Sequence, residues 1–358
     1  MKHKELIKII MVVNLINILF LSSLLVNANS SNVLIGHKDI VRTVDFSPEG
    51  TLIGTGSNDD SVKLWDTETC ELIRTLVGHE DDVMSIAFSP NKNQIASGSL
   101  DSKVIIWDLN GGEVLEELTY NNTKIFSVKY SPDGDLLAVG TSGNYVLIYD
   151  TSSWAIWKIL VGHTNWVWDV EFSSNGTLLA GASIDKNIIL WNVSSGKVLI
   201  TIQAHKSFVY DIEFMNFNNI LVSGGRDGKV KFWNLSSKSE IYSLDFGNFC
   251  IFSLALNPEE SELAIGSDDP DISVIDVSNG TTIKSLKGHG SAIRSISYSP
   301  SGKTLASGSA DNKTILWNLD NIDSSSASSI KNSTVTSFSS LFFFLSFSLT
   351  VKYRKKKN

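Results

Sequence analysis

Cysteine is scarce in this sequence, and basic residues are scarce in its central part. Only two cysteines occur in 358 residues, which excludes a disulfide-dense scaffold and a cysteine-rich zinc module. The two ends hold eight of the 30 basic and one of the 38 acidic residues, which leaves 22 basic against 37 acidic side chains between them, a net charge of about −15. A groove that binds nucleic acid needs the opposite charge, so no nucleic-acid partner is expected.

The chain nevertheless has ample apolar material. Hydrophobic residues make up 42% of it, which excludes a uniformly disordered chain. A length of 358 residues corresponds to two or three domains of roughly 150 residues, but a closed all-β fold can be longer.

The first 28 residues have the pattern of a secretory signal peptide. Three lysines within the first eight residues precede an apolar run over residues 9–26. Val26 and Ala28 supply small residues at the positions that a signal peptidase reads, which predicts cleavage after Ala28. The alternative is an uncleaved signal anchor, because Asn14 and Asn17 interrupt a rather long apolar run.

The C-terminal end has a three-part pattern. A Ser-rich spacer at 323–334 precedes an apolar segment at 335–351 and a basic tail at 352–358. The apolar segment has 17 residues, the short end of what spans about 30 Å of hydrocarbon, so it predicts a transmembrane helix. Because positive clusters stay in the cytoplasm, the tail is expected to be cytoplasmic and residues 29–322 extracytoplasmic. The same layout also fits a surface-sorting signal that a transpeptidase cuts.

Acceptor triplets for N-linked glycans support this topology mildly. An Asn- and Ser-rich chain produces such triplets by chance, and Asn121, Asn175 and Asn279 are predicted as potential sites. The triplets begin at Asn29, Asn121, Asn175, Asn192, Asn234, Asn279, Asn312 and Asn332.

The central part repeats with one fixed period. Seven times, an aromatic or apolar residue followed by Asp or Asn ends a β-rich run, and each step is 42 residues. The pairs are Trp65-Asp66, Trp107-Asp108, Tyr149-Asp150, Trp191-Asn192, Trp233-Asn234, Ile275-Asp276 and Trp317-Asn318. Such a period indicates a repeat architecture rather than two or three ordinary domains.

Other residues keep the same register. Alternating apolar residues broken by Pro, Gly and Asp turns predict four short strands in each unit. A Gly-His or Ala-His dipeptide precedes the strands at a constant offset in five units, at Gly36-His37, Gly78-His79, Gly162-His163, Ala204-His205 and Gly288-His289.

These motifs resemble the WD-repeat (beta-transducin repeat) family, over residues 32–320. The resemblance implies an all-β fold, a seven-bladed β-propeller of four-stranded blades that forms one monomeric ring. It also implies that the last blade is closed by a strand from the chain start, here residues 29–35. Cys70 and Cys250 fall at non-equivalent places of distant repeats, so no disulfide between them is expected.

Most units contain His, a hydroxyl residue, Asp and Trp at fixed offsets. A Ser-His-Asp set can mark a hydrolase, but catalysis needs one activated nucleophile and these sets recur. The resemblance implies instead a structural hydrogen-bonded network. The sets are His37, Thr55, Asp59 and Trp65; His79, Ser97, Asp101 and Trp107; His163, Asp185 and Trp191; His205, Ser223, Asp227 and Trp233; and His289, Ser307, Asp311 and Trp317.

The third, fourth and sixth units depart from this pattern. The fourth has Gly181 at the hydroxyl position. The third and sixth lose the network, which predicts looser upper loops there. The four positions hold Asn121, Val139, Gly143 and Tyr149 in the third unit, and Gly247, Ile265, Asp269 and Ile275 in the sixth.

Positions that are free of packing rules should report function. By the resemblance, three columns of residues project onto the top face of the propeller. Aromatics concentrate there in units three to six, together with arginines, which is the composition of binding hot spots. The alternative is that some of them fill the channel. The predicted partner-binding residues are Arg42, Phe126, Trp166, Trp168, Phe208, Tyr210, Arg226, Phe252 and Arg294.

The sequence therefore predicts a non-enzymatic cell-surface scaffold that binds a protein, peptide or glycan on its top face. No cofactor and no metal are expected; Asp268-Asp269-Pro270-Asp271 is interpreted as a solvated turn rather than a calcium site. The alternatives are an exported propeller enzyme or cofactor protein, and a cytosolic WD-repeat scaffold whose ends have been misread.

Overall fold

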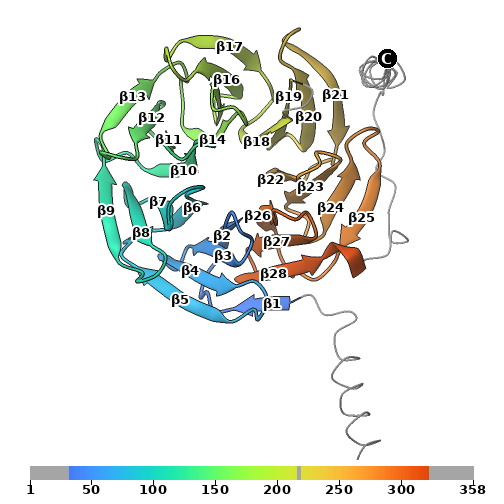
Figure 1. Ribbon diagram of the computed structural model, residues 1–358. Helices are drawn as coiled ribbons and strands as arrows, with labels where there is room; N and C mark the ends of the chain where they lie inside the picture. Colours follow the sequence, from blue (N-terminus) through green and yellow to red (C-terminus); the bar gives the residue numbers. More distant parts are fainter. Residues whose placement is uncertain (1–31, 216–218, 322–358) are drawn as a thin grey trace, which may run out of the picture.

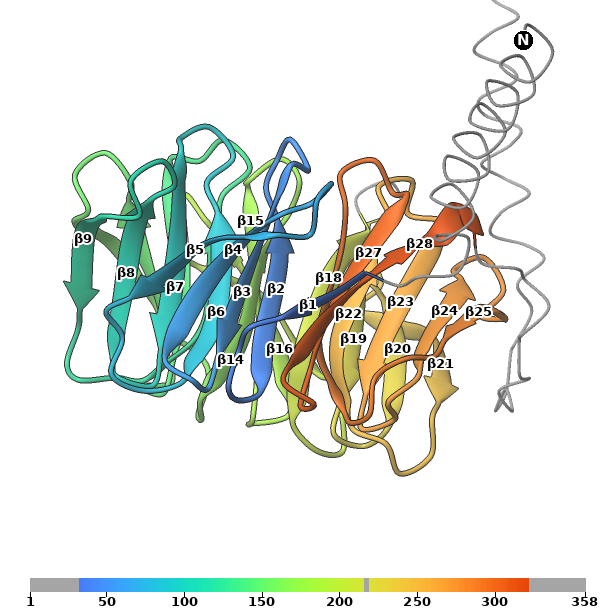
Figure 2. The same ribbon diagram turned by 90° about the horizontal axis from the view of Figure 1, so that it is seen from below.

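Seven four-stranded antiparallel sheets surround a central channel (Figure 1). This computed structural model describes residues 32–215 and 219–321. The predicted signal peptide, spacer, transmembrane helix and basic tail lie outside these residues. Within them, the predicted seven-bladed propeller is confirmed, and Figure 2 shows it from the side as a disc of steeply inclined strands.

Each blade follows the chain from the channel outward, except the last. Blade 1 comprises β2 (Val41–Phe46), β3 (Leu52–Ser57), β4 (Ser61–Asp66) and β5 (Leu72–Val77). Blade 2 comprises β6 (Val83–Phe88), β7 (Gln94–Ser99), β8 (Lys103–Asp108) and β9 (Val114–Thr119). Blade 3 comprises β10 (Ile125–Tyr130), β11 (Leu136–Thr141), β12 (Val146–Asp150) and β13 (Ile156–Leu160). Blade 4 comprises β14 (Val167–Phe172), β15 (Leu178–Ser183), β16 (Asn187–Asn192) and β17 (Val198–Gln203).

The remaining blades complete the ring. Blade 5 comprises β18 (Val209–Met215), β19 (Ile220–Gly225), β20 (Lys229–Asn234) and β21 (Ser239–Asp245). Blade 6 comprises β22 (Ile251–Leu256), β23 (Glu262–Ser267), β24 (Ile272–Asp276) and β25 (Thr282–Leu286). Blade 7 comprises β26 (Ile293–Tyr298), β27 (Thr304–Ser309), β28 (Lys313–Asn318) and β1 (Asn32–Ile35).

The core lies between the blades. Seven apolar clusters each join two neighbouring blades, one cluster at each interface of the ring. Small residues of the second strand allow this close packing: an added Cβ at Gly98 would lie 2.5 Å from Cγ2 of Ile125 in the next blade. The periodic small-residue strand in the sequence is therefore the surface on which the next blade packs.

The first described strand closes the ring. Strand β1 pairs antiparallel with β28, with Leu34 opposite Thr314, and the two lie side by side in Figure 1. Leu34 is 2% exposed and packs in the cluster that joins blades 7 and 1, with Val41, Phe46 and Trp65. The prediction that the chain start completes the last blade is confirmed.

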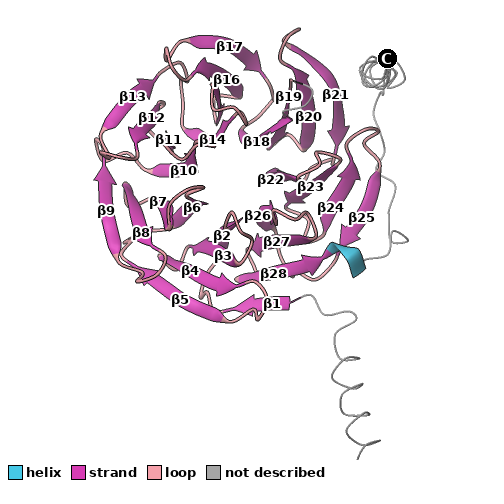
Figure 3. Cartoon of the chain, in the orientation of Figure 1, coloured by secondary structure: helices cyan, strands magenta, loops and turns pink. Residues whose placement is uncertain are grey.

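Helix is almost absent from the described part of the chain. It contains one three-residue 3-10 helix, η1 (Leu319–Asn321), and otherwise strands, turns and loops (Figure 3). Across residues 32–215 and 219–321, no helix has the length and apolarity needed to cross a membrane.

Candidate interaction site at the channel mouth

A β-bulge recurs at the second residue of every innermost strand. In blade 1, Val41 pairs with Ser57 and Thr43 with Gly56, so Arg42 is an extra residue in the ladder. A bulge turns its side chain out of the regular alternation, and here the seven extra residues line one cavity of about 240 Å³ at the end of the channel. They are Arg42, Met84, Phe126, Trp168, Tyr210, Phe252 and Arg294. We call these seven residues the mouth ring.

The aromatic members of the mouth ring touch one another in sequence order. The rings of Phe126 and Trp168 stack at 4.8 Å and 17°, and Trp168 meets Tyr210 at 5.3 Å. Tyr210 in turn meets Phe252 at 5.3 Å. These contacts form one continuous aromatic arc over blades 3 to 6. Stacked and edge-to-face ring pairs are favourable contacts, so they stabilise the arc.

Phe126 is the one buried residue among the predicted partner-binding residues. The side chain of Phe126 is 6% exposed, because two tryptophan rings stack against it. The ring centre of Trp166 lies 5.2 Å from that of Phe126, and the ring centre of Trp168 lies 4.8 Å from it. Phe126 therefore packs within the aromatic arc and lines the cavity, and its contact with a partner stays a prediction. Trp168 is also partly buried, so Trp166, which is 41% exposed, is the exposed one among the predicted top-face aromatics of blades 3 and 4.

Two arginines from neighbouring blades complete the mouth ring. The guanidinium of Arg294 lies 4.0 Å from the ring centre of Phe252. Arg42 donates from Nε to Oδ1 of Asn58 at 2.7 Å and lies 3.9 Å from a carboxylate oxygen of Asp82. Burial and then the charge of Arg294 lower the pKa of Arg42, and both arginines line the same cavity.

The other two predicted columns form the surface around the mouth ring. We call the face that carries the loops before the innermost strands (36–40 in blade 1) and the turns between second and third strands (58–60) the top face. In every blade a backbone hydrogen bond joins the two columns there, for example from Arg226 N to Phe208 O at 2.8 Å. The exposed guanidinium of Arg226 lies 5.1 Å from the ring centre of Phe208, so these two predicted residues are brought together.

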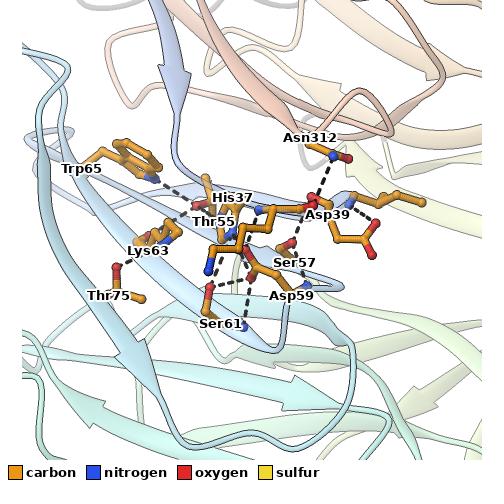
Figure 4. A network of polar contacts seen from close by, with 12 residues as sticks. His37, Asp39, Thr55, Ser57, Asp59, Ser61, Lys63, Trp65, Thr75 and Asn312 are labelled. Carbon is orange, nitrogen blue, oxygen red and sulfur yellow. Dashed lines mark hydrogen bonds and ion pairs between the residues drawn. The ribbon is translucent and has the colours of Figure 1, made fainter.

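The His-hydroxyl-Asp-Trp sets form hydrogen-bonded chains. In blade 1 the indole of Trp65 donates to Oγ1 of Thr55 at 2.9 Å, and that oxygen lies 2.7 Å from Nε2 of His37. Nδ1 of His37 lies 2.9 Å from Asp59 (Figure 4). Since the hydroxyl already accepts from the indole, its own proton points to Nε2, and Nδ1–H donates to the carboxylate. Blades 2, 5 and 7 repeat the chain.

The electrostatics of these chains suit a structural role. Burial alone would raise the pKa of Asp59, but hydrogen bonds from Ser61, from the backbone of Lys38 and from His37 lower it to about 2. Burial lowers the pKa of His37, which favours the neutral imidazole. A fully bonded carboxylate and a hydroxyl engaged on both sides leave no activated nucleophile.

Blade 4 replaces the missing hydroxyl by rotating its tryptophan. Nε1 of Trp191 donates to the carbonyl of Val161 at 3.0 Å, and Nε2 of His163 faces the carbonyl of Gly181 at 3.2 Å. A Cβ added at Gly181 would lie 2.8 Å from the indole ring. The Trp191 ring therefore occupies the place of the absent side chain. The expected looseness of the loops in blades 3 and 6 stays a prediction.

Comparison with known families decides the assignment. The family model described as IFT122 first beta-propeller matches residues 24–269, about two thirds of the chain. The model described as WD domain, G-beta repeat matches residues 280–318. The chain belongs to the WD-repeat β-propeller family. This family typically provides non-enzymatic scaffolds for protein interactions.

Curated relatives match this WD-repeat chain over a single repeat length. A ribosome biogenesis protein BOP1 homolog of Aedes aegypti is 45% identical over 40 residues, which is 11% of this chain and 5% of that protein. The BOP1 homolog of Culex quinquefasciatus is 40% identical over the same length and the same shares. The chain thus matches about a twentieth of these relatives, which supports the repeat and nothing further.

A second ring of residues in the WD-repeat channel was missed by the sequence analysis. The residue after each bulge accepts a hydrogen bond from a backbone N–H of the next blade, at 2.5 to 3.4 Å, in all seven blades. The seven acceptors are Thr43, Ser85, Ser127, Asp169, Asp211, Ser253 and Ser295. We call these seven acceptors the belt. The signal for the belt in the sequence is a hydroxyl or carboxylate side chain that recurs every 42 residues.

Acidic residues accumulate in the lower channel, below the mouth ring. A cavity of about 380 Å³ is lined by Asp45, Lys129, Asp169, Asp211 and Glu213, among others. Lys129 forms an ion pair of 2.8 Å with Glu171. Burial and then the charges of Asp169 and Glu213 raise the pKa of Asp211 well above its ordinary range. The channel therefore carries two arginines at its mouth and a cluster of buried carboxyl groups around Lys129 below it.

The three predicted glycan acceptors lie on the surface, and the two cysteines are partly buried. Asn121, Asn175 and Asn279 are all exposed. Cys70 and Cys250 are free thiols in blades 1 and 6. Among residues 32–215 and 219–321, no group of three or more His, Cys, Asp or Glu side chains is arranged to hold a metal ion.

Proposed function

We propose that this WD-repeat propeller is a membrane-tethered scaffold on the extracytoplasmic side, and that its partner docks on the top face over the mouth ring. One observation carries the docking site. Seven bulges with one repeated geometry point side chains that vary from blade to blade at one cavity, whereas the packing positions repeat. Aromatic and arginine side chains predominate there, as in binding hot spots.

The family supports a protein or peptide partner. A glycan could also stack on the same aromatic arc, and it would show itself by competition with free sugars. The tether rests on the sequence pattern of the two ends, an apolar run and an apolar segment each flanked by basic residues.

Replacing Trp166 with alanine should weaken partner binding at least tenfold and leave the melting temperature almost unchanged. Trp166 is 41% exposed, so it has much surface to bury against a partner and little to lose from the fold. Trp168 is a poorer probe, because its ring also packs against Phe126 and Tyr210. The measurement is quantitative affinity purification of the full-length chain from the cells that express it.

An equally exposed tryptophan provides the control. Trp157 on the outermost strand β13 is also 41% exposed, so Trp157→Ala removes the same kind of surface far from the mouth ring. Unchanged partner capture by W166A, or an equal loss with W157A, would refute docking on the top face.

The tether has its own test in intact cells. A protease added outside should digest the propeller and spare an epitope at the C-terminus. A glycosidase should increase the electrophoretic mobility of the chain, and Asn→Gln changes at 121, 175 and 279 should reduce that shift. A propeller that is protected until the membrane is permeabilised would instead establish the cytosolic scaffold.

A further inference from the structure

We propose that the mouth ring binds the carboxylate of an aspartate or glutamate side chain in an extended segment of the partner protein. This inference rests on the proposed docking site and names the chemistry that the site recognises. It is argued from the unpaired arginine, the size of the cavity and the charges around it.

Arg294 is the group that lacks a partner. Its Nε is buried and has no hydrogen-bond acceptor within the described residues. The centre of its guanidinium lies 4.0 Å from the ring centre of Phe252, a contact that holds the planar group in place. A buried donor without an acceptor is costly, so the site favours a ligand that brings an acceptor.

Arg42 supplies the second cation of the site. Its side chain is fixed by Asn58 and by Asp82, and the charge of Arg294 lies close enough to lower its pKa. Asp82 offsets one of the two positive charges, so the pair has room for one negative charge. An anion between them would relieve their mutual repulsion and satisfy Arg294, in the geometry in which arginine binds carboxylates.

The size of the cavity limits the ligand. Pockets for drug-sized ligands measure roughly 300–1,000 Å³, and the cavity at the mouth ring measures about 240 Å³. It therefore suits one inserted side chain rather than a whole small molecule. Residues on either side of that side chain would lie on Trp166, which is exposed, and on Phe208 beside Arg226.

The lower channel limits how deep an anion can go. Asp169 and Asp211 directly follow Trp168 and Tyr210 in their strands, and their carboxylates line the next cavity down. Burial and neighbouring carboxyl groups raise the pKa of Asp211 and Glu213 there, so a further carboxylate would be disfavoured in the same way and the anion is confined to the level of the arginines. The same carboxyl groups would attract a cationic side chain into the lower channel, which is the rival occupant that the test must separate.

The test uses three blocked pentapeptides that differ in one residue. Acetylated and amidated Gly-Leu-X-Leu-Gly, with X as Glu, Gln or Lys, is titrated into the full-length chain while tryptophan fluorescence is followed. We expect the Glu peptide to bind at least tenfold more tightly than the Gln peptide and to weaken with salt. Arg294→Gln should remove that preference and leave the weak Gln-peptide affinity unchanged.

A second arginine controls for loss of the fold. Arg74 on the outer strand β5 also has a buried Nε without an acceptor among the described residues, so Arg74→Gln is the matched variant and should not change peptide binding. Equal binding of the Glu and Gln peptides, no measurable binding of either, or preference for the Lys peptide would overturn the carboxylate assignment. If W166A still weakened partner capture in that case, the carboxylate assignment would fail but the proposed docking site would stand.

Discussion

Replacing Leu34 with aspartate should open the ring and destabilise the propeller by more than about 4 kcal/mol. Leu34 is the buried residue of β1, and it packs against Val41, Phe46 and Trp65 of the neighbouring blade. A carboxylate there would be buried without a partner. Because β1 is the strand that joins the two ends of the ring, its loss also exposes the edge of β28. Thermal unfolding followed by circular dichroism measures the effect.

The adjacent residue is the control for this variant. Ile35 belongs to the same strand but is 74% exposed, so Ile35→Asp should change stability by only about 0.5 kcal/mol. Equal melting temperatures for L34D and I35D would mean that closure by β1 does not stabilise the ring.

Replacing Asp211 with asparagine should stabilise the chain by on the order of 2 kcal/mol near pH 8 and have little effect near pH 4.5. The lower channel raises the pKa of Asp211 through burial and through Asp169 and Glu213. The folded chain therefore keeps a proton that the unfolded chain loses above about pH 4, and stability falls as the pH rises toward the raised value. Asparagine removes this penalty and still accepts from the N–H of Leu254.

Two further measurements check the sign. The wild-type chain should be most stable at weakly acidic pH, because the lowered pKa of Asp59, about 2, makes stability fall below about pH 4. The charge of Asp169 contributes to the raised pKa of Asp211, so the stabilisation by D169N and D211N together should be less than the sum of the two single effects. A loss of stability in D211N that is equal at both pH values would contradict the account of the channel.

The 42-residue period predicted the fold, because each turn and packing residue recurs with it and a closed ring satisfies all seven units. Spacing identified the His-hydroxyl-Asp-Trp sets, and the family resemblance implied that they are hydrogen-bonded, as the chain through Ser97 shows. The burial of Phe126 could not be predicted from the sequence. Phe126 and Trp166 are both aromatic residues of the predicted top-face columns, and only their stacking in the structure shows that Phe126 is the buried one. The rotation of Trp191 depends on space left by Gly181.

The bulges and the acidic lining of the lower channel could be identified only from the structure. A bulge is a shift in register between β2 and β3, and neither strand shows it alone. The belt of acceptors, such as Thr43 and Ser85, resembles an ordinary polar face when one strand is read by itself. The predicted membrane segments rest on the sequence.

The partner's position on the propeller is tested most directly by site-specific photo-cross-linking in living cells. A photoreactive amino acid replaces Lys124, which is exposed on the top face beside Phe126, or Glu116, which is exposed on the outermost strand β9. Docking over the mouth ring predicts a discrete adduct from position 124 that W166A abolishes, and none from position 116. An adduct from position 116 with none from position 124 would contradict it.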